Sequence, residues 1–237
     1  MTESLISYLQ KKPFVAILRG VQSNEIISIA RVLVDSGFSI IEVPLNSPDP
    51  LTSITNLSNE FGEKILIGAG TVLQKTDVLD IKNAGAKLAV APNANPEVIT
   101  AAKDGGLITI PGIATPTEAF TAIGLGADAL KLFPAESAPP EVLKAFKAVL
   151  PKPFPVLPVG GITPEKIGPY IQAGASGFGL GSALYKPGSS AKEVHEKAEK
   201  VLEMANSVME EAGKEIFGVE VALIAEGSYG ESWGDAK

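Results

Sequence analysis

Eight short apolar runs recur along the chain, and longer segments with helical spacing separate them. Each run is nearly continuous in apolar residues, which is typical of parallel strands that are buried on both faces. In the segment after the first run, apolar residues recur at the three- and four-residue spacing of one helix face. The pattern therefore restricts the chain to folds built from alternating strands and helices. The runs cover residues 14–18, 40–44, 65–68, 88–91, 107–110, 129–133, 156–159 and 177–180.

Glycines mark the places where the expected helices end. Five of them follow a helical segment and come just before an apolar run, which is the position of a glycine C-cap; they are Gly37, Gly85, Gly106, Gly126 and Gly174. Eight such units predict an α/β fold of the (β/α)8 TIM-barrel type, with a helix at its N-terminus. An open doubly wound sheet is the main alternative. No Gly-x-Gly-x-x-Gly pattern follows the first run, and this favours the closed barrel.

The length of 237 residues suits one α/β barrel. We expect a barrel domain over residues 1–212 and a C-terminal tail over residues 213–237. In the tail, Phe217, Val219, Val221 and Leu223 alternate as in a strand. An edge strand, an oligomer contact and a frayed tail are all compatible with this segment.

Composition excludes several classes of protein. The net charge of −7 argues against a nucleic-acid partner, because proteins that bind nucleic acids usually carry a basic face. The chain has no cysteine, and its single histidine, His195, lies in a charged segment, so we expect no transition-metal site. No signal peptide and no apolar run long enough for a membrane span is present, which predicts a cytoplasmic protein without a membrane partner.

Lys131 is the most informative single residue, because it places one ammonium within the sixth apolar run. Burial disfavours the charged form of a lysine and lowers its pKa, and the free amine attacks ketones. Glu42 lies within the second run, where a carboxylate is costly to bury without a partner. A buried Glu–Lys ion pair or a snorkelling lysine is the alternative without catalysis.

Polar residues and glycines follow several of the runs, at the end where barrels place their active sites. Arg19 follows the first run, Thr71 the third and Pro92 the fourth, and all three are substrate-binding candidates. Glycine-rich turns follow the last two runs. Their backbone N–H groups can approach an anion, which predicts a phosphate site made of Gly160, Gly161, Gly181 and Ser182.

Several stretches together resemble the 2-keto-3-deoxy-6-phospho-sugar-acid aldolases, a class I family that uses a lysine Schiff base. The resemblance implies that Lys131 forms the imine and that Glu42 moves protons. It also implies a phosphorylated keto sugar acid and pyruvate as ligands, no cofactor, and a homotrimer. In the implied site, Arg19 and Thr71 hold the substrate, and Gly160, Gly161 and Ser182 contact the phosphate. The stretches are residues 16–20, 41–48, 68–72, 131–136 and 159–162.

Two types of enzyme in this family differ in the configuration of the sugar acid. The gluconate type usually has Thr-Leu-Arg-Thr after the catalytic Glu and a Thr before the Gly-Gly pair. This chain has Pro-Leu-Asn-Ser at 44–47 and Val159, which resemble the 6-phosphogalactonate type. The expected reaction is therefore cleavage of 2-dehydro-3-deoxy-6-phosphogalactonate to pyruvate and D-glyceraldehyde 3-phosphate.

Three alternative functions remain open at this point. They are a gluconate-type aldolase of the same family, a phosphate-binding epimerase or isomerase, and a non-catalytic assembly protein. In the epimerase or isomerase, Glu42 and an acidic partner transfer protons, and Lys131 acts only through its charge.

Overall fold

The computed structural model describes residues 4–217, in which strands alternate with helices along the chain. The strands are β1 (Phe14–Ile17), β2 (Ile40–Pro44), β3 (Leu66–Gly70), β4 (Leu88–Val90), β5 (Ile108–Ile110), β6 (Gly112–Ile113), β7 (Leu130–Leu132), β8 (Val156–Pro158) and β9 (Phe178–Leu180). The helices are α1 (Leu5–Lys11), α2 (Ile26–Asp35), α3 (Pro50–Phe61), α4 (Lys75–Asn83), α5 (Pro96–Asp104), α6 (Pro116–Gly124), α7 (Pro140–Val149), α8 (Pro164–Gln172) and α9 (Ala191–Phe217), with a short 3-10 turn η1 (Ala135–Ser137) after β7.

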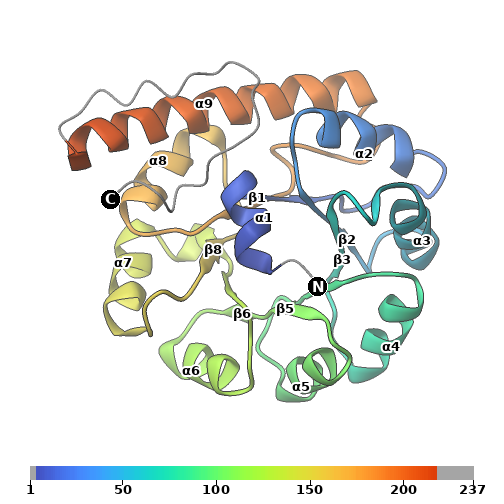
Figure 1. Ribbon diagram of the computed structural model, residues 1–237, viewed down its shortest axis with the longest axis horizontal. Coiled ribbons are helices and arrows are strands. Elements are labelled where there is room, and N and C mark those ends of the chain that lie inside the picture. Colours follow the sequence, from blue (N-terminus) through green and yellow to red (C-terminus); the bar gives the residue numbers. More distant parts are fainter. Residues whose placement is uncertain (1–3, 218–237) are drawn as a thin grey trace.

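All strand pairs are parallel, and they form two sheets. Six strands pair in the order β5-β4-β3-β2-β1-β9, and three pair in the order β6-β7-β8. A parallel bridge between Val159 and Gly179 joins the end of β8 to β9. The strands lie around a common centre, and helices α2 to α9 lie outside them (Figure 1). The predicted parallel α/β fold is confirmed.

This pairing does not show the predicted eight strands as one continuous sheet. The fifth apolar run continues past Ile110 into a second short strand, and Pro111 separates the two pieces. Proline has no N–H to donate to a ladder. At this point the chain leaves β4 and joins β7 instead, because the Pro111 carbonyl accepts a hydrogen bond from the Lys131 N–H at 2.8 Å.

Side chains alternate along each strand between the centre of the ring and the helices. Ile41 and Val43 face outward into the large core shared with the helices, whereas Ile40 belongs to the inner cluster. Glu42 lies two positions after Ile40 and therefore points to the same face of its strand. Lys131 lies two positions after Ala129, which is also an inner residue, and points to the same face as Ala129. This alternation turns both charged residues toward the centre.

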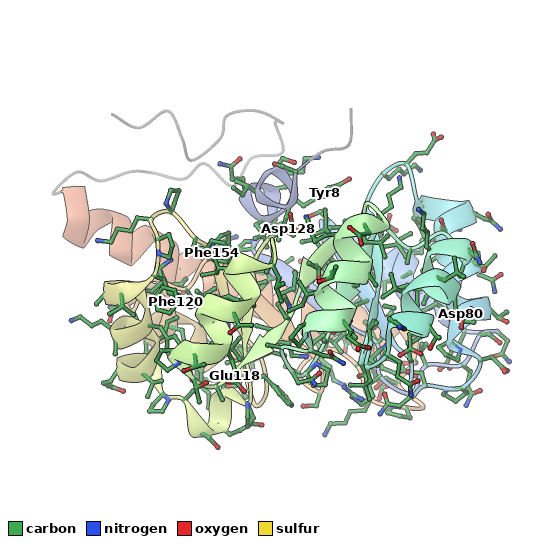
Figure 2. The ribbon with its side chains drawn as sticks, turned by 90° about the horizontal axis from the view of Figure 1, so that it is seen from below. Tyr8, Asp80, Glu118, Phe120, Asp128 and Phe154 are labelled. Atoms are coloured by element: carbon green, nitrogen blue, oxygen red, sulfur yellow. The ribbon has the colours of Figure 1, made fainter. Side chains whose placement is uncertain are left out.

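Helix α1 covers one end of the strands, so the predicted N-terminal helix is confirmed. Its Leu5 and Leu9 are buried against the inner cluster. Figure 2 shows α1 at the end of the molecule where Tyr8 and Asp128 lie, with Glu118 at the opposite end. Lys131 follows Asp128 along the chain toward that opposite end, which α1 leaves uncovered.

The helix ends agree with the glycine pattern. The five predicted C-cap glycines all have φ between 75° and 95°, a region that other residues rarely adopt. The expected boundary at residue 212 falls inside α9, which continues to Phe217. The rest of the alternating segment lies outside the described residues. Over residues 4–217, none of the helices is long and apolar enough to cross a membrane.

Candidate active site

Lys131 lies at the centre of β7 with only 5% of its surface exposed. Burial lowers the pKa of its ammonium, the nearby Glu42 carboxylate opposes this shift, and the Arg19 charge adds to it. The Nζ atom is 4.8 Å from the centroid of the Phe133 ring. The amine therefore sits in an apolar environment that favours its neutral, nucleophilic form.

Glu42 lies in the middle of β2 and is 1% exposed. Burial raises the pKa of its carboxyl group, while the positive charges of Lys131 and Arg19 act in the opposite direction. Its Oε2 atom has no hydrogen-bond partner among the described residues. Within residues 4–217 no ion pair joins Glu42 to Lys131, so a simple buried salt bridge does not account for the two charges.

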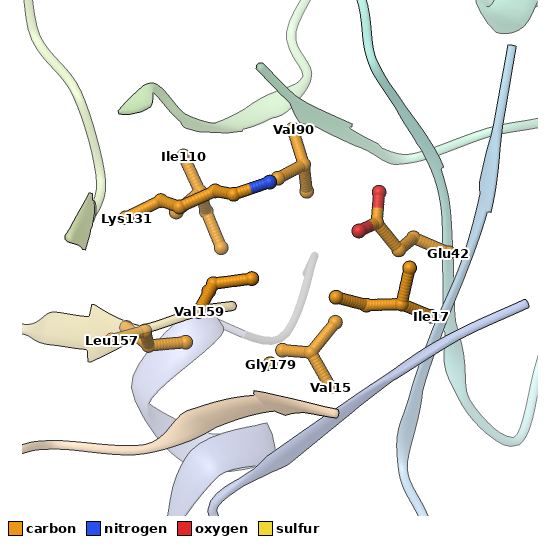
Figure 3. Close-up of a pocket in the computed structure, with 9 residues that line it drawn as sticks. All are labelled: Val15, Ile17, Glu42, Val90, Ile110, Lys131, Leu157, Val159 and Gly179. Carbon is orange, nitrogen blue, oxygen red and sulfur yellow. The ribbon is translucent and has the colours of Figure 1, made fainter. Parts of the chain in front are cut away.

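The two side chains share an apolar pocket, which confirms that Lys131 and Glu42 face each other across the interior. Figure 3 shows them reaching from opposite sides of the pocket, with the amine and the carboxyl group turned toward the same space. Strands of both sheets supply the apolar walls, which are Val15, Ile17, Val90, Ile110, Leu157, Val159 and Gly179. Apolar residues around a pair of titratable groups of this kind are typical of sites for proton transfer and covalent catalysis.

Arg19 follows β1 and is exposed, and its charge acts on both Lys131 and Glu42. Its Nη1 donates a hydrogen bond of 2.6 Å to Asn46 Oδ1. The next residue, Gly20, donates its N–H to the Ser47 hydroxyl at 2.9 Å. The Asn-Ser pair that follows β2 thus fixes the loop that carries the arginine.

A second support for this loop was not found from the sequence. Tyr185 is buried and donates its hydroxyl to Glu25 Oε1 at 2.6 Å. Burial and this carboxylate raise the tyrosine pKa well above its ordinary value. Gly20 has φ of 79°, and a methyl group built on it would lie 2.7 Å from Cγ of Pro187. No local signal could have revealed these contacts, because 160 positions separate Tyr185 from Glu25.

The other predicted residues lie at strand ends, outside the lining of this pocket. Thr71 follows β3 with φ of 56°, an uncommon conformation for a β-branched residue and one that clusters at functional sites. The Pro92 carbonyl packs directly against Gly112, and Gly112 is the register partner of Lys131. Thr71 and Pro92 therefore follow neighbouring strands at the open end of the site.

The two glycine turns lie side by side, because the Val159–Gly179 bridge joins their strands. Gly160 and Gly161 have φ of 105° and 60°, and Gly181 and Ser182 follow β9 directly. No hydrogen bond among the described residues uses the backbone N–H of Gly161 or Ser182. These donors are available to an anion.

No group of three or more histidine, aspartate or glutamate residues within residues 4–217 is arranged to hold a metal ion. The chain contains no cysteine.

Gly70 gives the Glu42 carboxyl group the space that it occupies. A methyl group built on Gly70 would collide with Oε2 of Glu42 and lie 2.6 Å from its Cδ. The Gly70→Ala variant is therefore expected to displace the carboxyl group and to lower kcat about 10- to 100-fold, the scale of a small misplacement of a reacting group. Steady-state kinetics check this. Gly124→Ala, where a methyl group meets no atom within 4 Å, is the matched control; equal losses in both variants would contradict the prediction.

Comparison with known proteins shows that a chain with this fold and this facing amine and carboxyl group is an aldolase, a class of lyase. Residues 5–219 match the family model "Aldolase: KDPG and KHG aldolase", and the chain belongs to this family. The 2-dehydro-3-deoxy-6-phosphogalactonate aldolase of Escherichia coli (strain K12) is 45% identical over 188 residues, which cover 79% of this chain and 92% of that protein.

Two solved structures extend the comparison. The "Native KDPGal structure" superposes with a TM-score of 0.82 at 43% identity, covering 84% of this chain and 97% of the other. The KDPG aldolase from Legionella pneumophila, described with pyruvate captured at low pH as a covalent carbinolamine intermediate, has a TM-score of 0.71 at 26% identity, covering 86% of this chain and 97% of the other.

Proposed function

We propose that the protein cleaves 2-dehydro-3-deoxy-6-phosphogalactonate to pyruvate and D-glyceraldehyde 3-phosphate through a Schiff base on Lys131. The observation that carries this proposal is the buried amine of Lys131, which faces the buried carboxyl group of Glu42 without an ion pair between them. The galactonate aldolase at 45% identity and the carbinolamine described for the Legionella enzyme support it.

The first half of the reaction forms the protonated imine, which later accepts the electron pair of the broken bond. The neutral Lys131 amine attacks the C2 carbonyl carbon of the substrate, and the resulting carbinolamine loses water to give a protonated imine. Glu42, directly or through a water molecule, donates the proton that the leaving hydroxide needs. Because burial raises the pKa of Glu42, its carboxyl group can hold a proton at a pH closer to neutrality.

The second half breaks the carbon–carbon bond. A base removes the proton of the C4 hydroxyl, the C3–C4 electron pair moves into the iminium, and the aldehyde leaves as glyceraldehyde 3-phosphate. The enamine that remains takes a proton at C3. One water molecule then hydrolyses the imine, which releases pyruvate and restores the free amine.

The remaining residues bind the substrate in this proposal. Arg19, Thr71 and Pro92 hold its carboxylate end near Lys131. The phosphate lies at the other end of the substrate, against the glycine turns. Its donors are the backbone N–H groups of Gly160, Gly161, Gly181 and Ser182, of which those of Gly161 and Ser182 have no acceptor among the described residues.

Trapping with pyruvate tests the covalent step. Borohydride reduction followed by peptide mass mapping is expected to find a reduced pyruvyl adduct on Lys131. An unlabelled lysine in active protein would favour the epimerase or isomerase. Phosphate binding without pyruvate release, measured with a lactate dehydrogenase-coupled assay, would favour the non-catalytic assembly protein.

Val159 is expected to decide between the two epimeric substrates. It lines the pocket, and its Cγ2 lies 2.7 Å from the position of a methyl group built on Gly179. Val159→Thr adds a hydroxyl that can hydrogen-bond a substrate hydroxyl, and we expect the kcat/KM ratio of gluconate over galactonate substrate to rise about 10- to 100-fold. Parallel rates on both substrates measure this ratio. Val149→Thr, on the exposed surface of α7, should leave the ratio unchanged.

The organisation of the protein is part of the same proposal. The two sheets act as one closed (β/α)8 barrel in which β5 and β6 share one place, a reading that the Val159–Gly179 bridge supports. Residues 1–212 carry the activity, and residues 213–237 are an appended tail. The enzyme acts in the cytoplasm as a homotrimer. Sedimentation equilibrium, which measures the mass of the assembly, tests the trimer directly.

A further inference from the structure

Glu136 lies across the first glycine turn, although its position two residues after the Phe133-Pro134 pair carries no such signal in the sequence. A methyl group built on Gly161 would lie 2.7 Å from both Cγ and Oε1 of Glu136. One built on Gly160 would lie 3.3 Å from its Cδ and would collide with its Oε2. The side chain thus fills the space that both glycines leave free.

The backbone around Glu136 is held firmly. Glu136 belongs to the turn η1, and the buried Tyr170 of α8 donates its hydroxyl to the carbonyls of Ala135 and Ala138, each at 3.0 Å. The Ala135 N–H in turn donates to the Val159 carbonyl at 2.9 Å. These bonds tie η1 to the strand end from which the glycine turn starts.

The Glu136 carboxylate has no compensating partner. Among the described residues it takes part in no hydrogen bond and no ion pair. Lys166 of α8 reaches the same turn, but its ammonium donates to the Gly161 carbonyl at 2.7 Å and forms no ion pair with Glu136. An unpaired negative charge therefore lies on the turn whose free N–H groups are available to an anion.

We propose that the negative charge of Glu136 limits the affinity of the phosphate end of the site for a phosphate dianion. This inference rests on the proposed function, which places the substrate phosphate on the Gly160–Gly161 turn. A carboxylate beside the turn repels the phosphate dianion of the substrate and that of glyceraldehyde 3-phosphate alike. Weaker binding of this product favours its release, a step that limits many enzymes.

Charge repulsion has two signatures that a purely structural role lacks. Two unit charges about 6 Å apart in water-exposed surroundings interact weakly, so removing the repulsion of a dianion is expected to tighten phosphate binding roughly three- to tenfold. The gain must also shrink as salt is added, since the Debye length falls to about 3 Å at 1 M ionic strength. Loss of packing against the glycines would weaken binding at every salt concentration.

The test compares Glu136→Gln with the wild type, using inorganic phosphate as the probe and phosphorus NMR titration as the measurement. The amide keeps the shape of the side chain and removes its charge. Glu63→Gln is the matched control, because Glu63 is also exposed but precedes β3, at the opposite end of the strands. We expect tighter binding in Glu136→Gln at low salt, convergence with the wild type near 1 M salt, and no change in Glu63→Gln.

Equal or weaker phosphate binding by Glu136→Gln at low salt would overturn the inference, as would a gain that persists at 1 M salt. Absence of phosphate binding in the wild type would overturn it as well. A separate measurement on the same proteins, the exchange of pyruvate methyl hydrogens with deuterated solvent, requires Lys131 and not the phosphate site. Loss of that exchange in the wild type would refute the proposed function, so the two failures are distinguishable.

Discussion

Replacing Lys131 with methionine is expected to lower kcat/KM for cleavage about 10⁴-fold or more, because no other group in the pocket can form the imine. The unbranched apolar side chain fits the space of the buried lysine stem. The coupled lactate dehydrogenase assay measures the loss. Borohydride trapping with pyruvate should fail in the same variant, while inorganic phosphate still binds.

A second consequence of Lys131→Met concerns Glu42. The Lys131 charge opposes the rise in the Glu42 pKa that burial causes, so its removal should move that pKa further upward. Infrared difference titration of the carboxylic acid band checks this direction.

Lys147→Met is the matched control for both measurements. Burial lowers the pKa of Lys147 too, but this lysine lies on α7 and donates to the Phe154 carbonyl at 2.8 Å. The control should keep its activity and its pyruvate adduct. Cleavage that survives in Lys131→Met, or that is lost equally in Lys147→Met, would contradict the assignment of the nucleophile.

Replacing Glu42 with glutamine is expected to lower kcat about 10²- to 10⁴-fold, the usual contribution of a positioned general acid–base. The amide keeps the shape of the carboxyl group beside Gly70 and cannot transfer its proton. Cleavage and the deuterium exchange of pyruvate should fall together, because both pass through the imine whose formation Glu42 assists. Glu63→Gln should retain both rates.

The same variant predicts a shift in pH dependence with a definite sign. The Glu42 carboxylate raises the Lys131 pKa against the effect of burial, so its removal should lower that pKa further. Trapping of pyruvate by cyanoborohydride should be slower in Glu42→Gln, and the pH midpoint of the remaining trapping should lie below that of the wild type. An unchanged or higher midpoint would show that the two groups do not interact across the pocket.

Much of the site could be predicted from the sequence, because the face of a strand on which a residue lies depends only on its position among its near neighbours. Side chains two positions apart on a strand share a face, so Lys131 shares the face of Ala129, and the structure shows that this is the inner face. The fold brings Lys131 and Glu42 into one pocket as predicted and places the two glycine turns side by side. One continuous eight-stranded ladder is not shown, since the pairing changes sheets at Pro111.

Other features depend on contacts between residues far apart in the chain. Glu42 lies on Gly70, and Glu136 lies on Gly160 and Gly161, yet neither acid is adjacent to its glycine in the sequence. The Tyr185–Glu25 hydrogen bond connects the loop after β9 to the start of α2. The spacing of residues along the sequence does not predict such pairs, because a glycine required by a distant side chain cannot be told from any other turn glycine in the sequence.

The amino-acid sequence alone determined the alternation of strands and helices, the glycines that end the helices, and the two charged residues within the apolar runs. These properties depend on backbone preferences and on the spacing of apolar residues over a few positions. Only the tertiary structure decided how strongly each charge is desolvated, which acids pack on which glycines, and where the parallel pairing breaks. Burial and long-range contact arise only when the separate units pack together, and they control the reactivity of the amine and the carboxyl group.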